Sequence, residues 1–173
     1  MKIISTPLDG VFEIENRVSQ DHRGSFVKTF NSDLFSQNAL DTDFRESFYS
    51  VSEKNVLRGM HYQRPPCDHA KLVYVLDGEI LDVAVDIRKE SKTFGQHFST
   101  TLSSENAKSL YLAKGFAHGF LTLSNQATVV YLTTTVYSPD FDTGIRWDSF
   151  GFNWPTSCPI LSKRDESFMC LYE

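Results

Sequence analysis

The sequence predicts an all-β fold, either a closed barrel or a jelly roll, with only short helices around it. Runs rich in Val, Thr and aromatic residues recur along the chain, as is typical of strands. Strand and helix patterns do not alternate, which argues against a parallel α/β architecture. Closure would also cover the strand edges. With 173 residues and 40% hydrophobic content the chain can build one core, so we expect a single domain over residues 1–173.

The strongest strand signals lie in the middle of the chain. Residues 72–76 and 79–87 flank an Asp-Gly pair, and such a pair between two β-rich runs predicts a hairpin. Residues 116–123 and 127–137 form a second pair of predicted strands around a short polar break. We therefore expect antiparallel β-structure through most of this region.

Helix signals are few. Asn31 or Ser32 can cap a short helix that ends near residue 40, and Ser103 or Ser104 can begin one or two further turns. We expect the tail after Trp154 to pack across the barrel as loop and short helix. The predicted helices are therefore peripheral.

Alternate residues of a strand share a face, so the predicted strands also indicate which side chains meet. His118 lies on one such face, Tyr131 and Tyr137 share another, and Lys71 lies on a third. If these faces point inward, His118, Tyr131 and Tyr137 converge in one cavity. Lys71 would bring an amine to it.

Charge and composition exclude several classes of protein. A net charge of -5 argues against a nucleic-acid binder held by phosphate contacts, so we expect no nucleic-acid partner. The chain shows neither a signal peptide nor a stretch long enough to span a membrane, so we expect a cytoplasmic protein. Its three cysteines, Cys67, Cys158 and Cys170, fit reduced thiols better than a disulfide framework or a zinc site.

The densest cluster of reactive side chains is the segment VLRGMHYQ, residues 56–63, which Lys71 follows closely. His61 in this segment has the side chain best suited to take a proton near neutral pH, because an ordinary histidine has a pKa of about 6.5. A lone histidine is more often a structural residue than a base. Its significance therefore depends on the rest of the chain.

Five further segments extend this cluster into an ordered set. They are DHRGSF (21–26), AKLV (70–73), DVAVDIR (82–88), GFAHGF (115–120) and LSKRD (161–165). From about residue 10 to residue 168, the set resembles the signatures of the dTDP-4-dehydrorhamnose 3,5-epimerase family. The resemblance implies a cupin-like jelly-roll β-barrel that binds a nucleoside-diphosphate 4-keto-6-deoxyhexose. It also implies inversion at carbon 3, carbon 5 or both, without a cofactor or a metal, in deoxysugar and polysaccharide biosynthesis.

The resemblance assigns catalytic roles residue by residue. His61 would be the base and Asp165 its partner, fixing the tautomer and stabilising the imidazolium. Tyr131 would be the acid on the other face of the sugar. Lys71 would stabilise negative charge on the C4 oxygen, and His118 would donate a hydrogen bond near the same oxygen.

The resemblance also implies the residues that bind the nucleotide. Arg58 and Arg23 match positions that contact phosphate, and Arg164 occupies the place of a family basic residue that would assist them. Tyr137 is similar to an aromatic residue that stacks on the base. In the family, Arg23 and Phe26 would reach the site of a neighbouring subunit, which implies a homodimer.

The match departs from the family pattern where the nucleotide is read. Glu46, Phe48 and Tyr49 stand where the family usually carries Gln, Asn and His, and Lys28 stands where glutamate is usual. These exchanges alter charge and hydrogen-bond direction, so a CDP-linked or other nucleotide sugar remains an alternative to a dTDP-linked one.

Other functions fit parts of the sequence. A metal-dependent cupin would draw ligands from His61, Asp68, His69 and His118, but Gln63 stands where the usual second histidine would be. A nucleotide-sugar 3,4-ketoisomerase shares the enolate intermediate, and a binding protein would need no catalysis. An NAD-dependent epimerase is disfavoured because no G-x-G-x-x-G follows a predicted strand.

Overall fold

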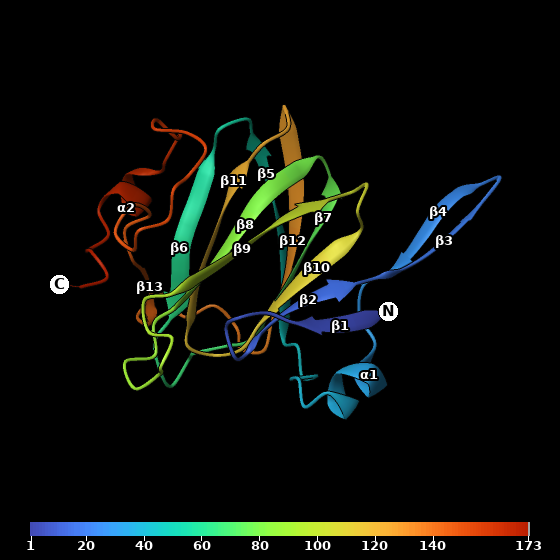
Figure 1. Cartoon of the computed structure of the whole chain (residues 1–173), viewed down its shortest axis with the longest axis horizontal. Helices are drawn as coiled ribbons and strands as arrows, with labels where there is room; N and C mark the ends of the chain where they lie inside the picture. The colour runs from blue at the N-terminus through green and yellow to red at the C-terminus, as the bar shows by residue number, and fades with distance from the viewer. Residues whose placement is uncertain (173) are drawn as a thin grey trace.

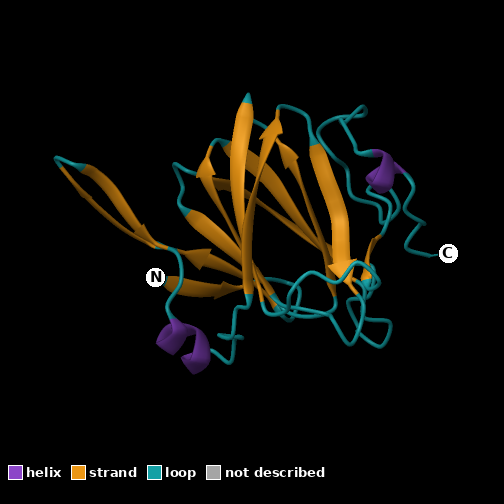
Figure 2. Cartoon of the chain, turned by 180° about the vertical axis from the view of Figure 1, so that it is seen from behind, coloured by secondary structure: helices purple, strands orange, loops and turns teal. Residues whose placement is uncertain are grey.

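The computed structural model describes residues 1–172 and consists mostly of β-strands, which confirms the predicted all-β class (Figure 1). The strands form two sheets that face each other, and a separate hairpin projects from them (Figures 1 and 2). None of the helices in the described residues is long and apolar enough to cross a membrane.

The six-stranded sheet has the order β1 (Lys2–Ser5), β2 (Val11–Glu15), β10 (Lys108–Leu112), β7 (Lys71–Asp77), β12 (Gln126–Thr133) and β5 (Glu46–Glu53). The five-stranded sheet has the order β13 (Asp142–Gly144), β6 (Leu57–Gln63), β11 (Phe116–Thr122), β8 (Glu79–Asp86) and β9 (His97–Ser103). The projecting hairpin is β3 (Arg17–Asp21) with β4 (Gly24–Lys28). All pairings between these strands are antiparallel.

The main core lies between the two sheets. Val73 and Val129 of the six-stranded sheet pack with Ile80, Ala84 and Phe120 of the five-stranded sheet, and all five are almost fully buried. Burial of a side chain of this kind contributes about 1.5–3 kcal/mol, so the core fixes the inward register of both sheets. The inward directions predicted for Lys71, His118 and Tyr131 follow from this register.

Both outer faces of the sheets are partly covered. Helix α1 (Ser32–Gln37) places Phe35 against Leu72 and Tyr111 of the six-stranded sheet. The C-terminal tail packs Leu171 against buried residues of the five-stranded sheet, and it contains the short helix α2 (Lys163–Glu166). The predicted position of the tail across the barrel is therefore confirmed (Figure 1).

The predicted Asp-Gly hairpin is wrong, although both of its strands exist. Strand β7 pairs with β10 and β12, whereas β8 pairs with β9 and β11, so the Asp-Gly turn carries the chain from one sheet to the other. Strands β11 and β12 are separated in the same manner. Gly78 has φ +77, and a Cβ on it would lie 2.1 Å from the Gln126 carbonyl oxygen. The signal located a tight turn correctly, but turn chemistry does not specify which strands pair.

Three element boundaries also differ from the prediction. Strand β12 ends at Thr133, so Tyr137 lies on the segment that follows the strand. Helix α1 is capped by Asn31, whose Oδ1 accepts the Leu34 N–H at 2.9 Å, but it ends at Gln37. Residues 104–106 form a turn after β9 rather than a helix, because Ser103 and Asn106 satisfy each other's backbone N–H groups.

Strands β6 and β11 approach each other very closely at Gly59 and Gly119. A Cβ on Gly59 would lie 2.6 Å from the Gly119 Cα, and Gly59 has φ +144, a conformation that side chains disfavour. The register shifts just beyond His118, which stands directly opposite His61. The two glycines therefore allow the strand contact that places both histidines side by side.

Candidate active site

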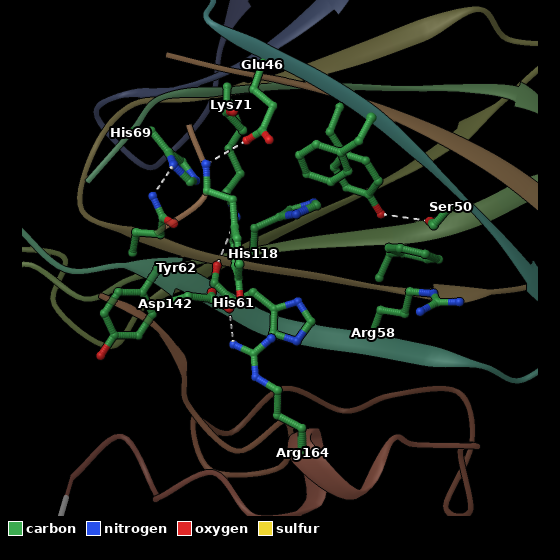
Figure 3. A pocket seen from close by; sticks show the side chains of 16 residues that line it. Glu46, Ser50, Arg58, His61, Tyr62, His69, Lys71, His118, Asp142 and Arg164 are labelled. Atoms are coloured by element: carbon green, nitrogen blue, oxygen red, sulfur yellow. Dashed lines mark hydrogen bonds and ion pairs between the residues drawn. The ribbon is translucent and has the colours of Figure 1, made fainter. Parts of the chain in front are cut away.

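A cavity of about 270 Å³ opens between the two sheets and gathers most of the predicted site residues (Figure 3). The candidates that line it are Glu46, Phe48, Arg58, His61, Lys71, His118, Tyr131, Tyr137 and Arg164. They come from strands β5, β6, β7, β11 and β12, the segment after β12, and helix α2. The barrel therefore brings together residues that are distant in sequence.

His61 and Asp165 form a hydrogen-bonded pair at one wall of the cavity. His61 Nε2 lies 2.8 Å from Asp165 Oδ1, and Asp165 Oδ2 accepts the Gly59 N–H at 3.2 Å. Burial raises the pKa of Asp165, but hydrogen bonds led by that from His61 hold it below its ordinary value. A carboxylate acceptor selects the tautomer with hydrogen on Nε2, which leaves the Nδ1 lone pair free to take a proton.

A short helix and an aromatic ring hold this pair in place. Ser162 caps α2 by accepting the Asp165 N–H at 3.1 Å, which fixes the carboxylate beside His61. Phe168 lies edge-on to the His61 ring, with 5.8 Å between centroids. The imidazole is therefore oriented from two sides, while its side chain retains 31% exposure towards the cavity.

A second histidine pair lies deeper, and one of its members was not predicted. His118 Nε2 lies 2.9 Å from both oxygens of Asp82, and the two side chains are almost fully buried. Asp82 belongs to one of the sequence segments noted above, and its place on an inward face of β8 was the available signal. Its carboxylate selects the same tautomer in His118 as Asp165 selects in His61.

Tyr131 enters the cavity from the opposing six-stranded sheet. Its hydroxyl lies 3.2 Å from Ser50 Oγ, and its ring stacks on Phe48 with centroids 4.8 Å apart and planes 17° apart. Burial raises its pKa well above the ordinary value of 10.0, while Ser50 and Arg58 oppose the shift. The phenol therefore remains protonated at neutral pH and is able to donate.

Lys71 is the buried cation of the cavity. Its Nζ donates to the His61 carbonyl oxygen at 3.1 Å, and only 9% of the residue is exposed. Burial lowers the pKa of Lys71 from 10.5 to about 8, although Asp142 and Asp82 pull it upward. The ammonium therefore persists at neutral pH, and its weak solvation strengthens its attraction for negative charge.

Two arginines border the cavity at separate places. The Arg164 guanidinium forms an ion pair with Asp142 at 2.6 Å, and Figure 3 shows this side chain rising from the C-terminal segment. Arg58 Nε donates to Ser52 Oγ at 2.8 Å. Asp142 and Ser52 were not predicted; neither sequence position carried a signal beyond its polarity.

A polar network fixes the segment that carries Tyr137. Glu46 Oε2 accepts the Tyr137 N–H at 2.8 Å, and Gln63 Oε1 accepts the Ser138 N–H at 2.6 Å. Gln63 Nε2 also lies 3.2 Å from His69 Nδ1, and burial together with nearby lysine charges lowers the pKa of His69 to about 3. His69 is thus a neutral histidine of the cavity wall. It and Gln63 were not among the predicted site residues.

Arg23 and Phe26 are the predicted residues that do not reach the cavity of their own chain. They lie on the β3–β4 hairpin, which projects away from the barrel (Figures 1 and 2). Arg23 bonds to Asp21 in the same hairpin, and Phe26 is 66% exposed. Their sequence-based assignment to a neighbouring subunit is consistent with this position.

The residues proposed as ligands in the metal-cupin interpretation are not arranged as a metal site. Within residues 1–172, no group of three His, Cys, Asp or Glu side chains is placed to hold a metal ion. His61 and His118 direct their Nε2 atoms to carboxylates that do not belong to that ligand set. This geometry favours proton chemistry at the two histidines.

The fold and the cavity define a β-barrel enzyme with histidine–carboxylate pairs on one wall and a buried tyrosine on the other. The family model described as dTDP-4-dehydrorhamnose 3,5-epimerase matches residues 5–173. A protein of that name from Methanothermobacter thermautotrophicus is 43% identical over 177 residues, covering 99% of this chain and 95% of that protein. The chain therefore belongs to the dTDP-4-dehydrorhamnose 3,5-epimerase family, which confirms the resemblance seen in the sequence.

Solved structures agree with the fold. The dTDP-6-deoxy-D-glucose-3,5-epimerase of Legionella pneumophila Philadelphia 1, in complex with dTDP-4-keto-L-rhamnose, superposes with a TM-score of 0.94 at 39% identity. The match covers 99% of this chain and 93% of that one. ChmJ, a 3'-monoepimerase from Streptomyces bikiniensis in complex with dTDP-quinovose, superposes with a TM-score of 0.93 at 32% identity. This match covers 98% of this chain and 87% of that one. The cupin-like barrel is therefore confirmed, and the fold is shared by enzymes named for different numbers of carbons.

Proposed function

We propose that the protein epimerises a dTDP-linked 4-keto-6-deoxyhexose at carbon 5, carbon 3 or both, by removing a proton and returning one to the opposite face. One observation carries the proposal: His61, paired with Asp165 on the five-stranded sheet, shares a cavity with Tyr131 from the opposing sheet. Inversion needs a base and an acid on different sides of one ring, and two facing sheets supply them.

In the first step, Nδ1 of His61 takes the proton next to the C4 ketone. The departing electron pair moves into the ring and onto the C4 oxygen, giving an enolate. Asp165 accepts the hydrogen bond from Nε2 throughout and stabilises the imidazolium as it forms. The carboxylate remains ionised, because its hydrogen bonds hold its pKa low.

The enolate oxygen requires a positive or hydrogen-bonding neighbour. Lys71 is the buried cation of the cavity, and His118 lines the same space with its Nε2 bound to Asp82. Groups fixed before the reaction stabilise developing charge without reorganisation, and low solvation increases their effect. Lys71 is therefore assigned to the C4 oxygen as a cation. His118 is assigned to the same oxygen in its imidazolium form, whose Nδ1–H can donate while Nε2–H stays on Asp82.

In the second step, Tyr131 gives its hydroxyl proton to the carbon from the face opposite His61. The electron pair of the enolate forms the new C–H bond, and the C4 carbonyl is restored. Ser50 bonds the phenol oxygen and lowers the cost of the phenolate that remains. Proton exchange with water then resets Tyr131 and His61.

The remaining cavity residues are assigned to the nucleotide. Arg58 and Arg164 are exposed cations at its edge and suit the diphosphate. Tyr137 is 59% exposed and presents a flat face for the base, beside the carboxylate of Glu46. Phe48 contributes an apolar wall beside Tyr131.

We infer a homodimer in which each projecting hairpin brings Arg23 and Phe26 to the cavity of the other subunit. The outer face of the six-stranded sheet supports this, because Tyr49, Val51 and Leu76 expose apolar side chains there. A second copy of the chain would cover them. Sedimentation analysis is expected to give a dimer, and a monomer with full activity would refute the inference.

We also infer one epimerase domain over residues 1–173, because the family model matches residues 5–173, and we infer a cytoplasmic location. Limited proteolysis is expected to leave the barrel intact as one fragment. Cell fractionation that recovered the protein in another compartment would refute the location.

The test of the function is proton NMR of the purified protein with dTDP- and CDP-4-keto-6-deoxyglucose in deuterium oxide. Deuterium incorporation at carbon 5 or carbon 3 with inversion, faster for the dTDP sugar, is expected. Absence of exchange with both sugars would refute the proposal. Movement of the carbonyl group would instead identify a ketoisomerase, and a faster CDP sugar would reassign the nucleotide.

A further inference from the structure

Strand β5 holds one side of the cavity through a row of alternate residues. The row consists of Glu46, Phe48, Ser50 and Ser52, and each member contacts a residue assigned above to catalysis or binding. Glu46 accepts the Tyr137 N–H, Phe48 stacks on the Tyr131 ring, Ser50 bonds the Tyr131 hydroxyl, and Ser52 bonds Arg58. A strand at the edge of its sheet thus contacts functional groups at every second position.

Two members of this row act on the same side chain. Phe48 stands directly opposite Tyr131 in the β5–β12 pairing, so the cross-strand geometry places one ring over the other. The near-parallel stack covers one face of the phenol, and His118 lies edge-on to it with centroids 6.2 Å apart. The Tyr131 ring therefore has an aromatic neighbour on two sides.

Ser50 fixes the other end of the ring. Its Oγ lies 3.2 Å from the Tyr131 hydroxyl, two residues along β5 from Phe48. A stack alone permits the ring to slide in its plane, and a single hydrogen bond permits it to tilt. Together the two contacts define where the phenol oxygen lies.

We propose that Phe48, acting with Ser50, is a positioning residue that holds the Tyr131 phenol on the face of the sugar opposite the base. The proposal rests on the proposed function, since it concerns the proton-return step. It assigns to Phe48 a role in stereochemical outcome rather than in substrate affinity. Phe48 is 47% exposed, so it is not retained by core packing alone.

The position of the phenol determines where the proton returns. After His61 takes a proton, the enolate can be protonated by Tyr131, which inverts the carbon, or by His61 itself, which restores the original centre. His61 is partly exposed and exchanges its proton with solvent, so the second route gives exchange without inversion. A displaced phenol therefore raises the ratio of exchange to inversion.

The experiment measures both rates by NMR in deuterium oxide for three variants of one position. Phe48→Ala removes the ring, Phe48→Leu keeps apolar volume without a flat face, and Phe48→Tyr keeps the flat face. The ratio of exchange to inversion is expected to rise about tenfold or more in the first two, since small displacements of a reacting group are costly. Phe48→Tyr is expected to restore the wild-type ratio.

Two further variants complete the design. Ser50→Ala is expected to shift the ratio in the same direction by a smaller factor. Tyr172→Leu removes an exposed ring that contacts Phe94 outside the cavity, and it is expected to leave the ratio unchanged.

Equal loss of exchange and inversion in Phe48→Leu would overturn the positioning role, and so would an unchanged ratio. A wild-type protein without exchange would instead refute the proposed function itself, because the base step precedes anything that Phe48 affects. The two failures are therefore distinguishable.

Discussion

The two walls of the cavity hold their functional side chains by different means. On the five-stranded sheet, His61 and His118 are each bonded to a carboxylate at 2.8 to 2.9 Å. On the six-stranded sheet, Tyr131 and Lys71 have no such partner; the phenol is held by an aromatic ring and a serine, and the ammonium by a carbonyl oxygen. One wall thus pairs its histidines with carboxylates, whereas the other holds its groups by ring stacking and by hydrogen bonds to uncharged oxygens.

This difference between the walls matches the proton transfers proposed above, from the sugar to His61 and from Tyr131 back to the sugar. A carboxylate that accepts the Nε2–H of His61 fixes the tautomer whose Nδ1 lone pair can take a proton. Burial of a phenol disfavours its anion, raising the pKa of Tyr131, and so keeps a proton available. In the proposed reaction, His61 on the five-stranded sheet therefore takes a proton, and Tyr131 on the six-stranded sheet returns one.

The largest expected effect comes from replacing His61, the proposed proton acceptor. His61→Asn is expected to lower both exchange and inversion on the order of ten-thousandfold, since it removes the base assigned to the first step. NMR in deuterium oxide measures both rates. His97→Asn, at an exposed histidine outside the cavity, serves as the matched control. If His61→Asn retained exchange, the five-stranded wall would not be the acceptor.

Replacing Tyr131, the proposed proton donor, is expected to separate the rate of exchange from the rate of inversion. Tyr131→Phe should lower inversion on the order of a thousandfold while exchange through His61 falls much less. Tyr111→Phe is the control, because it also removes a buried hydroxyl, one bonded to Asp41 outside the cavity. Inversion at the wild-type rate in Tyr131→Phe would refute the division between the walls.

The carboxylate behind His61 can be tested without changing its shape. Asp165→Asn keeps the volume but replaces the charge, so both rates are expected to fall about a hundredfold through loss of the tautomer and of imidazolium stabilisation. Asp148→Asn, which breaks an exposed ion pair with Arg146, is the control. Steady-state kinetics should show the loss in kcat. A loss confined to KM would argue against the pairing role.

The lowered pKa of Lys71 predicts a smaller effect, a dependence of kcat on pH. Because the pKa of Lys71 is about 8, kcat is expected to fall by about tenfold per pH unit above that value. Over the same range the unfolded chain binds the lysine proton and the folded chain does not, so this group makes stability rise with pH. Activity and thermal stability should therefore move in opposite directions between pH 8 and 10.

Lys71→Arg is expected to move the alkaline decline in kcat to higher pH, because the guanidinium keeps its charge. Lys108→Arg, at a lysine paired with Glu13 outside the cavity, should leave the profile unchanged. A decline in wild type that followed loss of folded protein would contradict the assignment to Lys71.

The sequence predicted the inward-facing residues better than it predicted strand partners. The alternation that placed Lys71, His118 and Tyr131 inward is a local property of each strand, and burial of the core enforces it. Pairing depends on contacts far along the chain, so the Asp-Gly turn could not indicate that β7 and β8 enter different sheets. Tyr137 reached the cavity although its strand ended earlier, because Glu46 holds its backbone.

The supporting residues were the hardest to predict. Asp82 and Ser50 can be assigned a role only from their contacts with His118 and Tyr131, because neither residue type indicates a function by itself. The row of residues on β5 can likewise be linked to Tyr131 only once the pairing of β5 with β12 is known. Motif resemblance identifies the reacting groups, while the residues that orient them are visible only in the assembled barrel.

The contact between Gly59 and Gly119 belongs to the architecture of the barrel rather than to its chemistry. Replacing His61 and Asp165 would leave the contact between the two glycines in place and remove only the proposed base and its partner. A variant that lost a glycine would lose the strand contact that sets His61 opposite His118, and with it the site, even with both histidines intact. The two glycines therefore belong to the architecture of the barrel, whereas Asp165 and Asp82 belong to the chemistry proposed for it.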